Sequence, residues 1–214
     1  MSKQAKQDQL WYKFLAGFIY EYESLSASGN ETIRFHMESV LNKFDNLANN
    51  PAIQGKEPSV LPVTDYLVEA IKREFNRNET PIFQALKEAM GKLSWEYGYD
   101  ELPEDLKNKY GFCEIIGPNG NLYSEKIISG LMLLAPGCHY PNHKHDNLEK
   151  SYICLSGEVS VNNCGVFRTN SLIYTAPGEI HKFTTGKFYS CLLLFSLIGN
   201  PEDLKKLSVD FQIN

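Results

Sequence analysis

The chain has 214 residues, of which 43% are hydrophobic, and it includes 12 Tyr and 12 Phe. This length and composition predict one sizeable core and exclude a disordered chain or two large independent domains. The formal charge is -5, and the Lys and Arg residues are spread along the chain, which argues against nucleic acid or an anionic membrane as the main partner.

The sequence also indicates a cytoplasmic protein. Its first residues show no apolar core followed by a small-residue cleavage site, as a secretory signal would, and no apolar run reaches membrane-spanning length. The five cysteines form no CxxC pair and are odd in number, which suits a reducing compartment and the role of small buried hydrophobes.

The first hundred residues are predicted to be mainly helical. Apolar residues recur at the spacing of one helical face in segments that begin near Trp11, Ile33 and Thr64. Thr80 precedes a proline, as a cap precedes the first helical position, and opens a fourth helix whose apolar face extends to Leu93.

The pattern changes near Tyr110. From there, short runs of β-branched, aromatic and leucine residues alternate with Gly, Pro and Asn, and the longest apolar run, Cys191 to Phe195, is expected to be a buried strand. Regular short strands with tight turns are typical of a sandwich or barrel. We therefore predict a helical region over residues 1–105 that packs on a β-barrel over residues 106–214.

Three histidines in the second half have a spacing that indicates a metal site. His143 and His145 lie two residues apart, and on an extended segment such side chains point to the same side. His181 follows a Pro-Gly turn that can deliver it from a distant strand to the same point. Imidazoles that converge in this way suit one divalent transition metal per chain, whereas histidines in surface turns are the alternative interpretation.

The surrounding residues resemble the two sequence motifs of the cupin family. The matching residues are Gly137-x5-His143-x-His145, Glu149, Gly157 and Pro177-Gly178-x-x-His181. This resemblance implies a mainly β fold, a cupin double-stranded β-barrel preceded by the N-terminal helical region. It also implies a metal inside the barrel, for which Fe, Zn, Mn, Ni and Co are the candidates.

The fourth metal ligand is expected to be a carboxylate, and its position is ambiguous. Glu149 follows His145 at an acceptable distance, but seven residues separate it from Gly157 where the motif has six, and the motif spacing leads to Lys150 instead. Neighbouring strand residues point to opposite sides, so a bulge would have to bring Glu149 inward. We expect Glu149 to ligate, because a lysine facing the metal would have to lose its proton; otherwise three histidines form the site.

About the last 120 residues resemble the cupin-type dimethylsulfoniopropionate lyases. The matching residues are Trp95-Glu96-Tyr97-Gly98-Tyr99, Glu114-Ile115-Ile116-Gly117-Pro118, Gly130-Leu131, Tyr140-Pro141-x-His143-x-His145, Glu149-x-Ser151-Tyr152 and Pro177-Gly178-x-x-His181. The chain departs from the family pattern at Lys150, where a second acidic residue would precede Ser-Tyr. The resemblance implies a carbon-sulfur lyase that converts this small carboxylate substrate to dimethyl sulfide and acrylate by β-elimination.

This elimination needs a cation near the carboxylate and a base that takes the α-proton. Tyr140 is the first candidate for the base, because a nearby metal can lower the pKa of a phenol. Tyr152 is the second, as a base or as a hydrogen-bond donor that orients the substrate. The sulfonium leaving group would favour aromatic faces. The available aromatic residues are Trp95, Tyr97, Tyr99, Tyr174, Phe183 and Tyr189.

Two other functions compete with the lyase. A three-histidine iron site would suit a metal-dependent cupin oxygenase, and a barrel without catalysis would suit a small-molecule sensor or storage protein. No basic recognition helix accompanies the barrel, which argues against a transcription factor. Exposed barrel edges and the helical layer are compatible with a homodimer.

Overall fold

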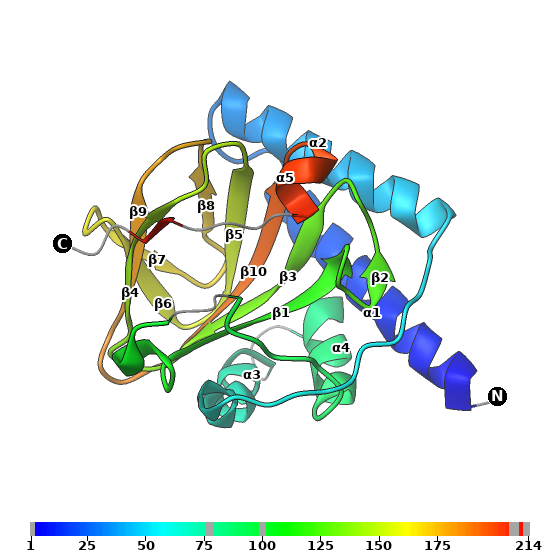
Figure 1. Ribbon diagram of the computed structural model, residues 1–214, viewed down its shortest axis with the longest axis horizontal. Coiled ribbons are helices and arrows are strands. Elements are labelled where there is room, and N and C mark those ends of the chain that lie inside the picture. The colour runs from blue at the N-terminus through cyan, green and yellow to red at the C-terminus, as the bar shows by residue number, and fades with distance from the viewer. Residues whose placement is uncertain (1–2, 76–78, 99–101, 206–209, 212–214) are drawn as a thin grey trace.

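The computed structural model describes residues 3–75, 79–98, 102–205 and 210–211 (Figure 1). Helices make up most of the first hundred residues, as predicted. They are α1 (Lys3–Leu25), α2 (Glu31–Asn49), η1 (Pro62–Tyr66), α3 (Leu67–Phe75) and α4 (Pro81–Ala89), and the short η2 (Glu104–Leu106) follows before the first strand.

Strands follow from residue 110 onward, with one short helix, α5 (Pro201–Lys205), near the C-terminal end. The strands are β1 (Tyr110–Gly117), β2 (Leu122–Tyr123), β3 (Ile128–Leu134), β4 (His139–Lys144), β5 (Glu149–Ser156), β6 (Glu158–Val161), β7 (Val166–Arg168), β8 (Leu172–Thr175), β9 (His181–Thr185), β10 (Cys191–Ile198) and β11 (Asp210–Phe211). They form a six-stranded sheet, ordered β2-β1-β3-β10-β5-β8, and a five-stranded sheet, ordered β11-β4-β9-β6-β7.

The six-stranded sheet lies between two hydrophobic cores, and its strands are therefore apolar on both faces. On β3, Leu131 and Leu133 belong to the core under the helices, whereas Met132 and Leu134 belong to the core inside the barrel. Strand β10 alternates in the same way, because successive side chains of a strand point to opposite faces. This explains the unbroken apolar run from Cys191.

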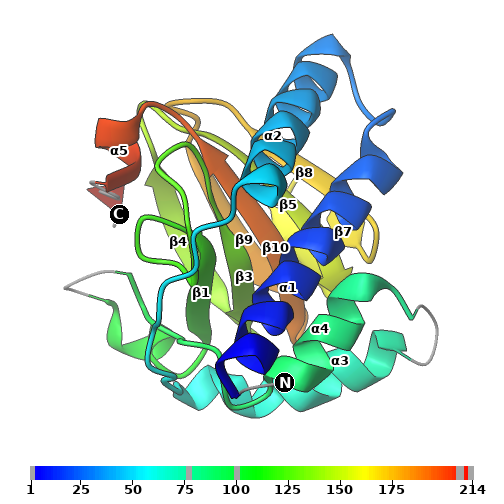
Figure 2. The same cartoon turned by 90° about the vertical axis from the view of Figure 1, so that its right-hand side faces the viewer.

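The helices cover the outer face of this sheet, as Figure 2 shows for α1 and α2. Helix α4 approaches α1 so closely that a Cβ at Gly17 would lie 2.9 Å from the backbone of Ile82. Thr80 precedes α4 as predicted, but its hydroxyl donates to Glu21 at 2.9 Å and does not cap the helix. The helix also ends at Ala89, earlier than predicted, because the chain leaves the helical conformation at Met90.

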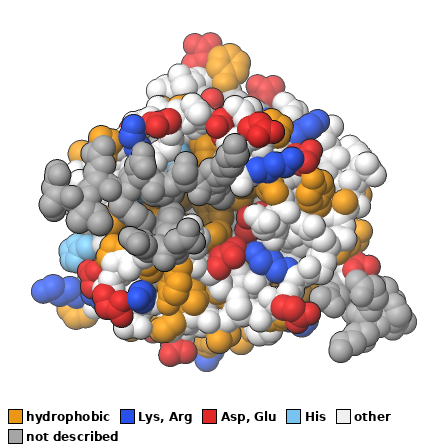
Figure 3. Space-filling view, viewed as in Figure 1, with side chains coloured by type: hydrophobic (Ala, Val, Ile, Leu, Met, Phe, Trp, Pro, Cys, Tyr) orange, Lys and Arg blue, Asp and Glu red, His pale blue; other side chains and the backbone are white. Residues whose placement is uncertain are grey.

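The predicted order of a helical region followed by a barrel of two facing sheets is confirmed. The division into domains at residue 105 stays a prediction, as does the homodimer. No helix among the described residues is long and apolar enough to cross a membrane. On the face visible in Figure 3, basic side chains lie interspersed with acidic ones.

Candidate active site

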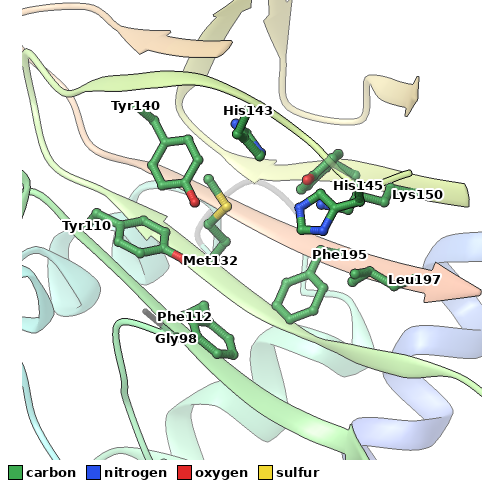
Figure 4. Close-up of a pocket in the computed structure, with 11 residues that line it drawn as sticks. Gly98, Tyr110, Phe112, Met132, Tyr140, His143, His145, Lys150, Phe195 and Leu197 are labelled. Atoms are coloured by element: carbon green, nitrogen blue, oxygen red, sulfur yellow. The ribbon is translucent and has the colours of Figure 1, made fainter. Parts of the chain in front are cut away.

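A cavity opens inside the barrel between the two sheets, and Figure 4 shows the side chains around it. Its volume is about 70 Å³, which is room for several water molecules or one small ligand. Its lining residues are Gly98, Tyr110, Phe112, Met132, Tyr140, His143, His145, Lys150, Tyr152, Phe195 and Leu197.

The pairing of β4 with β9 brings the predicted histidines together. His143 and His181 are directly opposed in the register of these antiparallel strands, and their ring centroids lie 4.1 Å apart. His145 follows β4 on the same side as His143, with ring centroids 5.6 Å apart. The structure thus confirms that the turn before His181 returns this residue to the HxH segment.

Two of these histidines, His145 and His181, have buried ring nitrogens that make no hydrogen bond with the described residues. Nδ1 of His143 donates to the carbonyl oxygen of Pro141 and Nδ1 of His181 to that of Glu179, both at 3.0 Å. A neutral imidazole that donates from Nδ1 carries a lone pair on Nε2. Nε2 of His181 and both ring nitrogens of His145 are buried without a hydrogen-bond partner among the described residues.

Burial also keeps these rings neutral. Desolvation lowers the pKa of His143 to about 2 and that of His181 to about 4, and it lowers the pKa of His145 as well. Neutral imidazole is the form that binds transition metals, so the chemistry of the three histidines fits a divalent ion. As the side chains stand, however, no three His, Cys, Asp or Glu residues in the described ranges lie close enough together to hold one.

Glu149 does not join the histidines. Its carboxylate contacts Nδ1 of His36 on α2 at 2.9 Å, on the helix side of β5, and its side chain is 40% exposed. Strand alternation, with no bulge at this point, instead turns the next residue, Lys150, into the cavity. The expectation that Glu149 completes the ligand set disagrees with this placement, and the motif spacing that led to Lys150 identified the inward residue.

Lys150 is therefore an unusual member of the cavity wall. It is only 4% exposed, and burial lowers the pKa of its ammonium group well below the ordinary value. No Asp or Glu of the described residues forms an ion pair with it.

Both tyrosines proposed as bases lie at the cavity. The ring of Tyr140 meets that of His143 edge to face, with centroids 4.8 Å apart, and the ring of Tyr152 lies 6.3 Å from that of His181. Figure 4 shows the hydroxyl groups of Tyr140 and Tyr110 directed toward the sulfur of Met132. Sequence reasoning had not identified Tyr110, whose ring centroid lies 4.7 Å from that of Tyr140.

The aromatic wall differs from the set available in the sequence. Tyr110, Phe112 and Phe195 line the cavity, whereas Trp95 belongs to the core under the helices and Tyr189 is exposed on the surface. Of the remaining aromatic candidates, Tyr97 and Phe183 pack in the barrel core, Tyr174 contacts His36, and Tyr99 lies outside the described residues. Alternation along β1 and β10 could have selected Phe112 and Phe195, but only once the inner face of each strand was known.

A second polar cluster, formed by Tyr22, His36, Glu149 and Ser151, lies between the helices and the outer face of β5. Nε2 of His36 contacts Oγ of Ser151 at 2.8 Å, and the hydroxyl of Tyr22 contacts the same oxygen at 2.7 Å. With the bond from His36 to Glu149, every member of this cluster has a partner. The cluster fixes β5 so that Lys150 and Tyr152 face the cavity.

The two sheets, with His143 of β4 lining the cavity and His181 of β9 opposite His143, form a cupin-like barrel. The model of the dimethylsulfoniopropionate lyase family matches residues 35–193, and the chain belongs to that family of carbon-sulfur lyases. A protein of Cereibacter sphaeroides, provisionally named dimethylsulfoniopropionate lyase DddL, is 36% identical over 197 residues, which cover 92% of this chain and 85% of that protein.

Solved structures agree with this fold over almost the whole chain. A chain from the crystal structures of the lyases RdDddP and RnDddQII matches with a TM-score of 0.69 and 18% identity, and covers 96% of this chain and 99% of its own length. The lyase DddQ from Ruegeria pomeroyi DSS-3 matches with a TM-score of 0.67 and 19% identity, over 96% of this chain and 97% of that one. Both matches therefore extend over the helices that precede the barrel in this chain.

Proposed function

We propose that the protein cleaves dimethylsulfoniopropionate to dimethyl sulfide and acrylate in a metal-dependent β-elimination. The observation that carries this proposal is the cavity in which His143, His145, Tyr140 and Tyr152 meet inside the barrel of a chain from this lyase family. The 36% identity to the DddL protein supports the choice of substrate. The small size of dimethylsulfoniopropionate also suits the cavity of about 70 Å³.

His143, His145 and His181 are the residues that would hold the metal. Their rings are neutral because they are buried, and His145 makes no hydrogen bond among the described residues that a rotation of its ring would break. When bound, a divalent cation supplies positive charge that stabilises the charge developing next to the substrate carboxylate. Glu149 is absent from this proposal because its carboxylate contacts His36 outside the cavity.

Tyr140 is the proposed base. In its phenolate form it takes the proton from the carbon next to the carboxylate, and the electrons of that C–H bond form the double bond of acrylate. The bond between carbon and sulfur breaks, and its electrons leave with the neutral dimethyl sulfide. Tyr152, on the neighbouring wall of the cavity, is the second candidate and orients the substrate through its hydroxyl.

Headspace detection of dimethyl sulfide tests the reaction directly. Protein is freed of metal, loaded with Fe, Zn, Mn, Ni or Co in turn, and incubated with dimethylsulfoniopropionate under air and under argon. We expect release with at least one metal and the same rate without oxygen, since the elimination is not an oxidation. Release with none of the metals would refute the lyase, and turnover that requires oxygen would favour the oxygenase.

Metal binding is tested separately by titration calorimetry. We expect about one divalent ion per chain, and a loss of affinity of about tenfold or more in each of His143→Ala, His145→Ala and His181→Ala. His139→Ala is the matched control, because this exposed histidine begins β4 outside the cavity. Unchanged affinity in all three cavity variants would show that the ion binds elsewhere.

A further inference from the structure

Among the described residues that line the cavity, Lys150 alone carries a side chain of the Lys, Arg, Asp or Glu type. It is the second residue of strand β5, points to the inner face of the sheet, and is 4% exposed. A buried charge is costly unless an opposite charge is near, yet no carboxylate of the described residues lies within 4.0 Å of its nitrogen. Burial alone favours the neutral amine, and a ligand carboxylate beside it would favour the ammonium form by supplying the opposite charge that the described residues lack.

The two sides of the cavity differ in chemistry. Figure 4 shows Lys150 beside His145 on one side, with Tyr110, Tyr140 and Phe112 on the other. The sulfur of Met132 and the ring of Phe195 lie between them. Aromatic faces and a thioether attract soft organic cations, whereas an ammonium group attracts a carboxylate. This polarity matches a small zwitterion with a carboxylate at one end and an onium group at the other.

We propose that Lys150 binds the carboxylate of the substrate and that Tyr110, Phe112 and Phe195 receive its onium end. This inference rests on the proposed function, because dimethylsulfoniopropionate is a zwitterion of this class. Lys150 thus fixes which end of the substrate faces the bases.

The polar cluster on the outer face of β5, formed by Tyr22, His36, Glu149 and Ser151, holds Lys150 in position. Glu149 and Ser151, its neighbours on β5, both bond to His36 on the helix side. Because alternate strand residues point to opposite faces, these two bonds direct Lys150 inward. The same bonds oppose a one-residue slip that would bring Glu149 into the cavity.

The binding test uses two probes that differ only in charge at the acid end, 3-(trimethylammonio)propionate and its amide. Trimethylamine is a poor leaving group here, so both probes report binding without turnover. Each is titrated calorimetrically into the full-length protein after chelator treatment, so that no metal contributes. We expect the carboxylate to bind about tenfold or more tightly than the amide, as for a charge-assisted hydrogen bond at a buried site.

Lys150→Met should abolish this preference while leaving the amide's affinity unchanged, since methionine keeps the length and apolar stem of lysine. Lys150→Gln is the second variant, in case methionine disturbs the wall. Lys182→Met is the matched control, because Lys182 adjoins His181 on β9 but does not line the cavity. It should keep the preference of the parent.

Three results would overturn the proposal: no preference in the parent, binding of neither probe, or a preference that survives Lys150→Met and Lys150→Gln. The release of dimethyl sulfide by the parent is scored separately. If the preference for the carboxylate probe depends on Lys150 but the parent releases no dimethyl sulfide, the proposed reaction is refuted and the role of Lys150 in carboxylate binding stands. If the parent releases dimethyl sulfide but shows no such preference, only the role of Lys150 in carboxylate binding is refuted.

Discussion

Strand β5 separates two polar clusters that differ in how completely their hydrogen bonds are made. On the helix side, Tyr22, His36, Glu149 and Ser151 satisfy one another. On the barrel side, His145 and His181 keep buried ring nitrogens without partners in the described part of the chain. Buried polar groups are normally paired, so unpaired ones indicate a place where a ligand belongs. This difference in hydrogen bonding distinguishes the structural cluster on the helix side of β5 from the candidate binding site on its barrel side.

The residue types in the cluster on the helix side of β5 could be mistaken for a catalytic triad. Ser151, His36 and Glu149 have the hydrogen-bond order of a serine hydrolase triad, with distances of 2.8 and 2.9 Å. Ser151 is nevertheless completely buried between sheet and helices, and Tyr22 also bonds to its oxygen. No substrate carbonyl can reach this oxygen, so we assign the cluster to the attachment of α1 and α2 to β5.

The largest effect is expected from removing one hydroxyl on the inner side. Tyr140→Phe should lower dimethyl sulfide release about a hundredfold or more while metal binding and fold persist, because the ring still packs and only the base is lost. Tyr22→Phe is the matched control on the outer side. It should reduce the free energy of unfolding by about 1 kcal/mol, by loss of the bond to Ser151, without lowering turnover.

Headspace assays of both variants at matched metal content decide this comparison. Full activity in Tyr140→Phe would refute the choice of base, and the same substitution at Tyr152 would then test the second candidate. A hundredfold loss in Tyr22→Phe would show that the two clusters are coupled.

A smaller effect concerns the buried carboxylate of Glu114 on β1, which has a hydrogen-bond partner but forms no ion pair within the described ranges. Its carboxylate accepts the backbone N–H of Asn119 at 2.7 Å, yet burial raises its pKa to about 7. Since the native state then binds the proton more tightly than the unfolded chain, this group stabilises the fold below pH 4.5 and that stabilisation is lost as the pH rises through about 7.

Glu114→Gln should remove this dependence, because the amide oxygen can accept the same N–H without a charge. Between pH 4.5 and 7 the parent should lose about 2 to 3 kcal/mol relative to the variant, measured by denaturant unfolding at a series of pH values. Parallel stability curves for the two proteins would contradict the raised pKa.

Much of the fold could be predicted because the local signals were strong. The helical stripes near Trp11 and Ile33 became α1 and α2, and the run from Cys191 became a central strand buried on both faces. The helix from Thr80 was predicted too long, since an apolar residue such as Leu93 also fits the packed segment that follows α4.

The site was predicted as far as strand alternation and motif order reach. They placed His143 opposite His181, and the two tyrosines named from the family resemblance line the cavity, while the metal site and the roles of these residues stay predictions. The preference for Glu149 over Lys150 failed to anticipate the structure because it weighed only ligand chemistry. What holds Glu149 outside is His36, 113 residues away on α2, and no pattern near the histidines contains that contact.

The smallest expected effect, and the most direct test of the two sides of β5, is Glu149→Ala. Because the carboxylate contacts His36 and its side chain is 40% exposed, its removal should cost about 1 kcal/mol of unfolding free energy. Metal affinity should stay within about twofold of the parent, whereas loss of a metal ligand lowers affinity about tenfold or more. Glu158→Ala, at another half-exposed carboxylate on the surface, is the control for a change of net charge. Calorimetric titration with one metal, together with denaturant unfolding, measures both quantities. A tenfold loss of metal affinity in Glu149→Ala alone would mean that β5 slips when metal binds, so that Glu149 replaces Lys150 in the cavity.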